Sequence, residues 1–180
     1  MRRGKTRTLG VMNGITAHAI AAGSNEAVFE LLGKELEKRL PDRDDPEFVV
    51  ELQKLPPGLR AMAATYELDV SLTLDDLGWH FGNWHNEELA KETAIGLEEL
   101  GAVELARLFR EAYGHAQKYW SELGSEKWMD WYHGSKLEEA VMPLNQAAWS
   151  LLKDRWNGIF SYWVEYAKRH PEKVGAKHDA

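Results

Sequence analysis

Two histidines lie among carboxylates near the middle of the 180-residue chain. His80 and His85 are five residues apart, with Asp75 and Asp76 before them and Glu88 after them. Imidazole together with carboxylate is the ligand set of catalytic zinc and of non-haem iron. Two ligands on one helix face need a four-residue spacing, so a turn would have to bring these histidines together. One interpretation is therefore a metal-dependent hydrolase or oxygenase.

A structural role for the same histidines is the competing interpretation. His80 would form a hydrogen bond within the core, and His85 would stand at the start of a helix. Further metal ligands, such as His115 or His133, would have to come from later helices. The structural interpretation requires no cofactor, and the rest of the sequence favours it.

Other common catalytic signatures are absent from the sequence. It contains no cysteine, which excludes thiolate nucleophiles, thiolate metal sites and disulfides. It also lacks the G-x-S-x-G elbow, the Walker loop, the Rossmann glycine pattern and the kinase signature. These absences favour a binding or regulatory protein over an enzyme.

Acidic residues are concentrated in one segment. The chain has 22 Lys and Arg against 29 Asp and Glu, a net charge of −7. Residues 67–104 contain ten acidic residues and the single base Lys91, so this segment alone carries −9. B-DNA carries one negative charge per about 1.7 Å of axis, so a protein that imitates DNA needs rows of carboxylates on rigid helices. Solubility alone would explain the same charges, because a charged helix face is usually a solvated face.

Seven of these carboxylates are expected to form an acidic binding face: Asp75, Asp76, Glu87, Glu88, Glu92, Glu98 and Glu99. Adjacent acids could serve in acid–base catalysis only within a cleft that shifts their pKa values. Near helix starts they more often cap the helix or lie in solvent. The net negative charge also argues against direct binding of nucleic acid or of anionic membranes.

Helices must position these residues, because apolar residues recur at three- and four-residue steps and no alternating strand pattern is present. Ser24, Pro57 and Asn86 are expected to begin helices, and Gly101 is expected to end one. A short helix between two loops is expected within residues 73–86. The predicted fold class is all-α, as a single compact multi-helix domain.

Aromatic residues fall into two groups. The first is expected to form a structural corner that presents the acidic face: Gly78, Trp79, His80, Phe81 and Trp84. The second follows Pro143, which is expected to precede a final long helix with an apolar stripe: Leu152, Trp156, Ile159, Phe160, Trp163 and Tyr166. Such a stripe is more often core than interface. A homo-oligomer whose interface includes Trp163 is the alternative.

Three regions are expected along the chain. Residues 1–22 form a basic leader, residues 23–170 the all-α domain and residues 171–180 a tail, with both ends mobile. Polar residues interrupt the apolar stretch of the leader, so it is a poor signal peptide. No segment approaches the length of a membrane helix, and a cytoplasmic protein is expected.

The segment from residue 55 to residue 111 resembles a known family. The resemblance rests on these motifs: Leu55-Pro56-Pro57-Gly58-Leu59-Arg60-Ala61, Tyr66-Glu67-Leu68-Asp69, Gly78-Trp79-His80-Phe81 with Asn83, and Leu100-Gly101-Ala102. Together they are similar to the C-terminal domain family named for the nineteen-kilodalton DNA mimic protein. The loop at Gly78 departs from that family, since one of two paired glycines is missing and His80 or Phe81 stands near the family's Gln.

The resemblance implies an all-α fold and, from the namesake, an acidic surface that imitates DNA and occupies DNA-binding proteins. We therefore predict a non-enzymatic binding or regulatory protein whose acidic face engages a basic protein partner. The metal-dependent enzyme and the homo-oligomeric structural module remain open as alternatives.

Overall fold

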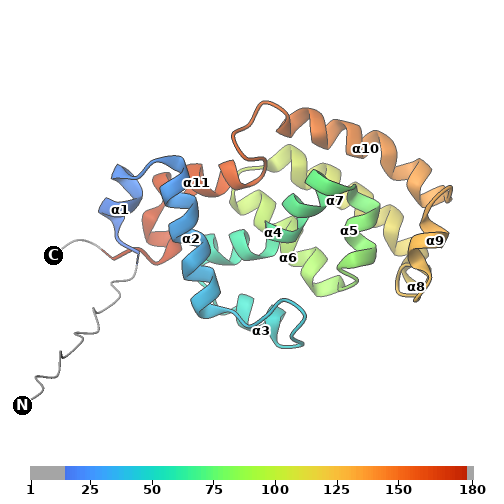
Figure 1. Cartoon of the computed structure of the whole chain (residues 1–180), viewed down its shortest axis with the longest axis horizontal. Coiled ribbons are helices and arrows are strands. Elements are labelled where there is room, and N and C mark those ends of the chain that lie inside the picture. Colours follow the sequence, from blue (N-terminus) through green and yellow to red (C-terminus); the bar gives the residue numbers. More distant parts are fainter. Residues whose placement is uncertain (1–14, 178–180) are drawn as a thin grey trace, which may run out of the picture.

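Helices joined by loops surround one central helix in the described part of the chain. This computed structural model describes residues 15–177, which Figure 1 shows as helices joined by loops. The α-helices are α1 (Ala17–Ala22), α2 (Asn25–Arg39), α3 (Phe48–Leu52), α4 (Pro57–Leu74), α5 (Leu77–Asn83), α6 (Glu87–Glu99), α7 (Val103–Ala116), α8 (Trp120–Leu123), α9 (Trp128–Tyr132), α10 (Lys136–Leu152) and α11 (Phe160–Arg169). Two 3₁₀ helices accompany them, η1 (Gln117–Tyr119) and η2 (Pro171–Val174). The predicted all-α class is confirmed.

Helix α4 is the central element of the domain. Buried residues occur on all its sides between Gly58 and Leu72, and a helix of this kind is stable only when neighbours surround it. Helices α2, α3, α5, α6, α10 and α11 all contact it. Helix α6 approaches α4 closely at Gly96, where a Cβ atom would lie 3.0 Å from the Ala61 carbonyl oxygen. The Thr93 hydroxyl of α6 donates a hydrogen bond to the Ala64 carbonyl at 2.8 Å.

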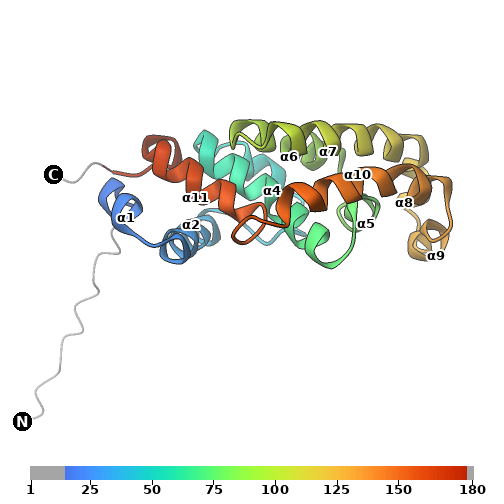
Figure 2. The ribbon, with the colours of Figure 1, turned by 90° about the horizontal axis from the view of Figure 1, so that it is seen from above.

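The other helices enclose α4 at different points along the molecule. Helices α1, α2 and α11 lie toward one end, and α8 and α9 lie at the opposite end (Figures 1 and 2). Helix α7 packs on α6, and α10 packs on both α7 and α5. Helix α5 is therefore enclosed by α4, α7, α9 and α10.

The predicted helix boundaries agree with the structure where local signals set them. The side chains of Ser24 and Asn86 accept hydrogen bonds from main-chain amides three residues later, at 3.3 and 3.0 Å. Pro57 is the first residue of α4, and Gly101 follows α6 with a φ of 81°. The short helix expected within residues 73–86 is α5. Caps and N-terminal proline act within one helical turn, so the sequence alone reveals them.

The prediction that Pro143 separates an earlier segment from one final long helix, with Leu152 to Tyr166 in it, is wrong. Pro143 lies inside α10 on its exposed side, where water can reach the carbonyl that the proline leaves without a helical partner. The chain instead leaves the helical path after Leu152, through a loop in which Asn157 and Gly158 have φ values of 58° and 57°. Asn and Gly tolerate this left-handed conformation, so this pair and not the proline divides the predicted stripe.

Asp69 of α4 holds this loop in place. Its carboxylate accepts a hydrogen bond from the main-chain amide of Ile159 at 2.6 Å. It thereby acts as a cap for α11, which has no side-chain cap of its own. A Cβ atom on Gly158 would lie 2.5 Å from Asp69 Oδ1, so only glycine allows this approach. Burial raises the pKa of Asp69 to about 6, although the amides of Ile159 and Phe160 act in the opposite direction.

Both ends of the described chain contribute to the core. Ile15, Ile20 and Val174 are buried, and Thr16 forms an isolated β-bridge with Lys177. Packed residues thus occur on both sides of the predicted 23–170 domain, whose exact limits remain a prediction. Residues 1–14 of the predicted leader and 178–180 of the predicted tail lie outside the described residues. Among residues 15–177, no helix has both the length and the apolar character needed to cross a membrane.

We predict that Asp69→Asn changes the pH dependence of stability. The folded-state pKa of Asp69 is raised, so its ionisation opposes folding as pH increases from about 4 through about 6. Asn keeps an acceptor oxygen for Ile159 but does not ionise. Relative to the wild type, the variant should gain on the order of 2 kcal/mol in free energy of unfolding between about pH 4 and pH 7. Denaturant unfolding across this range measures the difference, and a constant difference would contradict the prediction.

Candidate functional site

The residues of the predicted structural corner lie in helix α5 or directly after it. Gly78 lies directly against Tyr132 of α9, because a Cβ at position 78 would be 2.1 Å from the Tyr132 hydroxyl oxygen. That hydroxyl donates a hydrogen bond to the Asp76 carboxylate at 3.0 Å. Asp76 also caps α5 by accepting a hydrogen bond from the Trp79 amide at 2.9 Å. The corner is therefore a buried hydrogen-bonded junction between α5 and α9.

The aromatic residues of the corner pack against other elements. Phe81 is fully buried, and its ring centroid lies 5.2 Å from that of Phe109 in α7. Trp79 is half-buried and meets Trp128 edge-on, with 4.9 Å between the ring centroids. Trp84, which follows α5, is also half-buried. These contacts give the corner a structural role.

The two central histidines have separate partners. His80 is 2% exposed, and its Nδ1 lies 3.0 Å from the Ser71 hydroxyl oxygen of α4. Burial lowers the pKa of His80 to about 4, so the ring is neutral near pH 7. His85 Nε2 donates a hydrogen bond to the Trp120 carbonyl at 2.8 Å. The His85 ring also stacks on the Trp120 ring, with 4.3 Å between the ring centroids. Each histidine thus serves local packing.

The structure does not gather the predicted metal ligands. Within residues 15–177, no three His, Asp or Glu side chains are placed to hold one ion. Asp76 is committed to the α5–α9 junction, and Asp75 is exposed at the end of α4. His115 lies near the end of α7, whereas His133 Nδ1 is 3.6 Å from Glu138 of α10. The side-chain arrangement fits the structural interpretation.

Two residues of the predicted acidic face are buried and do not reach the surface. Asp76 is 8% exposed and Glu92 is 5% exposed. Glu92 accepts hydrogen bonds from Arg60 Nε and Nη2, both at 2.7 Å, and from Gln53 Nε2 at 2.9 Å. Burial acts to raise the pKa of Glu92, but the hydrogen bonds from Arg60 and Gln53 hold it below its usual value. Glu92 therefore ties α6 to α4.

The other five residues of the predicted face lie at or near the surface: Asp75, Glu87, Glu88 and Glu98 are exposed, and Glu99 is half-buried. Three of them pair with bases: Glu88 with Lys91 at 2.6 Å, Glu98 with Arg110, and Glu99 with Lys173 at 3.0 Å. Within the described part of the chain, Asp75 and Glu87 make no ion pair. The −9 segment is therefore not a continuous row of free charges.

The predicted aromatic stripe belongs to the core. Trp163 is fully buried, and its Nε1 donates a hydrogen bond to the Thr65 hydroxyl of α4 at 2.9 Å. Phe160 and Tyr166 are also buried, whereas Trp156 lies in the preceding loop and is 36% exposed. Trp163 is therefore not accessible for the oligomer interface considered from the sequence.

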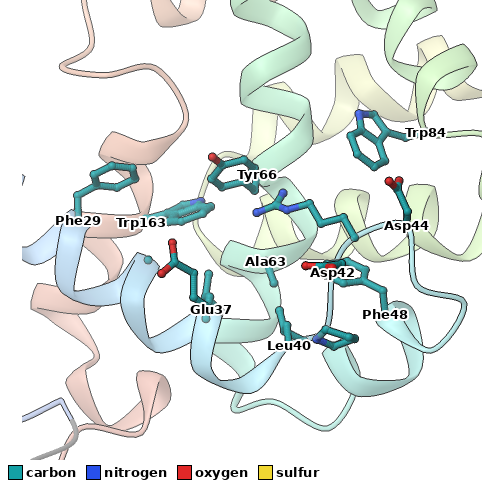
Figure 3. A pocket seen from close by; sticks show the side chains of 14 residues that line it. Phe29, Glu37, Leu40, Asp42, Asp44, Phe48, Ala63, Tyr66, Trp84 and Trp163 are labelled. Carbon is teal, nitrogen blue, oxygen red and sulfur yellow. The ribbon is translucent and has the colours of Figure 1, made fainter. Parts of the chain in front are cut away.

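A hollow of about 610 Å³ lies between α2, the loop that follows it, α3 and α4. Five aromatic side chains from separate segments line it: Phe29, Phe48, Tyr66, Trp84 and Trp163. Three exposed carboxylates also line it: Glu37, Asp42 and Asp44. Figure 3 shows Glu37 and Trp163 toward one end and Asp44 and Trp84 toward the other. We call this site the aromatic hollow.

Sequence reasoning missed the aromatic hollow because its rings come from five segments that no spacing rule connects. Periodicity within one helix places a ring on a face, but it does not reveal which helices meet. The available signal was the run from Asp42 to Asp45, which has three acids and one base directly after a helix end. Taken alone, such a run indicates only a solvated turn.

A family described as DMP19-like protein matches residues 53–170. The chain belongs to the DMP19-like protein family. The match confirms the resemblance found at residues 55–111 and extends it through α10 and α11. Comparison with curated proteins and with solved structures gives no match. In this DMP19-like chain, the part of the aromatic hollow contributed by residues 29–48 precedes the matched segment.

Gly78→Ala should destabilise this DMP19-like fold, because the new methyl group would overlap the buried ring of Tyr132. Overpacking of this kind costs about 1–3 kcal/mol. Gly114→Ala in α7 is the matched control, because a Cβ there meets no atom within 4 Å. It should instead stabilise the protein by about 0.5–1 kcal/mol through the preference of helices for alanine. Thermal unfolding of both variants tests this, and equal effects would contradict the packing argument.

Glu92→Gln and Glu88→Gln should separate a structural carboxylate from a surface carboxylate. The first change leaves the half-buried Arg60 guanidinium without its counter-charge, at a cost of about 2–4 kcal/mol in free energy of unfolding. The second removes only the exposed pair with Lys91 and should cost less than about 0.5 kcal/mol. Urea unfolding at neutral pH measures both values. A similar small loss in the two variants would show that Glu92 does not join α6 to α4.

Proposed function

We propose that the protein is a non-enzymatic binding protein whose exposed carboxylates engage a basic protein partner, in particular a DNA-binding protein. One observation carries the proposal: four carboxylates of the predicted face are exposed on a rigid helical scaffold, namely Asp75, Glu87, Glu88 and Glu98. The chain belongs to a family whose namesake is described as a DNA mimic. Exposed carboxylates that the fold does not need for its stability can take the place of DNA phosphate groups.

The placement of Glu87, Glu88 and Glu98 on helix α6 supports the proposal. Glu87 and Glu88 occupy the first turn, which Asn86 caps, so their main-chain positions are fixed. Glu98 lies on the same helix, about 15 Å farther along its axis at a rise of about 1.5 Å per residue. The pairs that Glu88 and Glu98 form are exposed, and such pairs contribute little to stability. Basic groups of a partner can therefore replace Lys91 and Arg110 at small cost.

Neutralising the exposed face should weaken binding of the basic partner without unfolding the protein. The test variant combines Asp75→Asn, Glu87→Gln, Glu88→Gln and Glu98→Gln. A matched control removes four exposed carboxylates that form no ion pair in the described chain: Glu126→Gln, Asp130→Asn, Glu139→Gln and Asp154→Asn. Binding is measured with DNA-binding proteins captured from a lysate of the source organism, in competition with duplex DNA.

The test variant should lose at least about tenfold in affinity and the control less than about threefold. The reason is that binding depends on charges that face the partner and not on net charge alone. Wild-type affinity should fall steeply as salt rises from about 50 to about 300 mM, because exposed charges are screened. Duplex DNA should compete with this protein for the partner. Salt-independent binding, or equal losses in the two variants, would refute the proposal.

A further inference from the structure

The aromatic hollow combines the two groups that hold an organic cation. Ring faces of Trp and Tyr attract Lys and Arg side chains through their quadrupole, and carboxylates add charge-assisted hydrogen bonds. Trp163 and Phe48 are buried and form a fixed floor, whereas Phe29, Tyr66 and Trp84 are half-exposed. A volume of about 610 Å³ lies within the range of ligand sites.

Arg43 demonstrates how this site holds a guanidinium group. Its Cζ lies 3.6 Å from the centroid of the Tyr66 ring, and its Nη1 pairs with the Glu67 carboxylate. Ring face and carboxylate thus act together on one cation of the chain itself. The arrangement favours Arg over Lys, because a planar guanidinium can stack on a ring while it donates hydrogen bonds in its plane.

The remaining charges of the hollow are not balanced. Arg43 is the only base among the residues that line it, and this base is already paired with Glu67. Glu37, Asp42 and Asp44 form no ion pair within residues 15–177. Arg43 covers one face of the Tyr66 ring, and Trp163 and Phe48 are buried. The hollow therefore offers a second cation the half-exposed rings of Phe29 and Trp84 and three carboxylates without an ion pair. Phosphate groups of a nucleic acid would be repelled from the same rim.

We propose that the aromatic hollow binds an arginine side chain presented by a basic segment of the protein partner. The inference rests on the proposed function, because the partner is again a basic protein. It assigns a second binding site, separate from the predicted acidic face. Glu37, Asp42 and Asp44 are not part of the predicted acidic face. They also precede the segment that matches the family.

The first test fills the hollow without changing any charge. Gly33 of α2 lines the hollow, and a Cβ on it would meet no atom within 4 Å, so a Gly33→Met side chain can enter the free space. The change also favours the helix, because glycine is a poor helix former. Gly114→Met in α7 is the matched control, since that position is equally open and does not line the hollow.

Calorimetry with the acetylated peptide Gly-Ser-Arg-Gly-Arg-Ser-Gly provides the measurement. Gly33→Met should reduce its affinity at least about tenfold, and Gly114→Met should leave it unchanged within about twofold, since only the first fills the site. The peptide with Lys in place of Arg should bind more weakly to the wild-type protein. Equal affinity of Gly33→Met and wild type would overturn the inference.

The second test removes the charges of the rim. The triple variant Glu37→Gln, Asp42→Asn and Asp44→Asn should lose at least about tenfold in peptide affinity. A matched triple variant, Glu126→Gln, Asp130→Asn and Asp154→Asn, changes the net charge equally and should lose less than about threefold. Equal losses would show that the peptide responds only to net charge, and would overturn the inference.

The quadruple variant of the acidic face separates this inference from the proposed function. If the hollow is the site, that variant keeps most of its peptide affinity. Peptide binding that is lost in the quadruple variant and kept in Gly33→Met overturns the hollow and leaves the proposed function standing. Tenfold tighter peptide binding by a chain that begins at Met12 would identify the chain's own basic leader as the occupant, and would overturn the assignment to a partner.

Discussion

The fold depends on satisfying the polar groups that α4 carries into the core. Thr65 accepts a hydrogen bond from Trp163, and Asp69 accepts one from the Ile159 amide. The Ser71 hydroxyl forms a hydrogen bond with the His80 ring. A buried polar group without a partner costs about 1–3 kcal/mol, so each of these bonds fixes a neighbouring element against α4. Apolar packing alone would let α5 and α11 slide along the central helix, because apolar contacts are not directional.

The same requirement divides the carboxylates of the acidic segment into two sets. Glu92 and Asp76 are held by partners inside the domain, whereas Glu87 and Asp75 remain in solvent. Glu88 and Glu92 are four residues apart on one helix, where periodicity places them on the same face. Glu92 is nevertheless buried beside Arg60 and Gln53, whereas Glu88 is exposed beside Lys91. Charge density along a sequence is thus a poor measure of charge density on a surface.

The sequence predicted the features that local chemistry determines. Ser24 and Asn86 cap their helices, because a cap depends on neighbours within one helical turn. Gly78 and Phe81 are buried, and the role of their corner in presenting an acidic face stays a prediction. Prediction failed where a group distant in the sequence determines the local structure. Asn-Gly at 157–158 is a turn signal, but the helical spacing of the surrounding aromatic residues concealed it. Asp69, which holds this loop, is distant in the sequence, so no local pattern reveals the contact. The aromatic hollow could not be predicted for the same reason.

The aromatic hollow is a consequence of the interactions that α4 makes. Asp69 fixes the loop before α11, and the Thr65 bond sets the orientation of Trp163, which forms the floor. Phe29 then packs on Trp163, with 6.1 Å between the ring centroids, and this contact positions α2. The floor thus combines Trp163 of the family-matched part with Phe48, which precedes it, and the charged rim comes from Glu37, Asp42 and Asp44. In the proposed binding of an arginine, the choice of ligand therefore depends on the rim, because the fold already determines the floor.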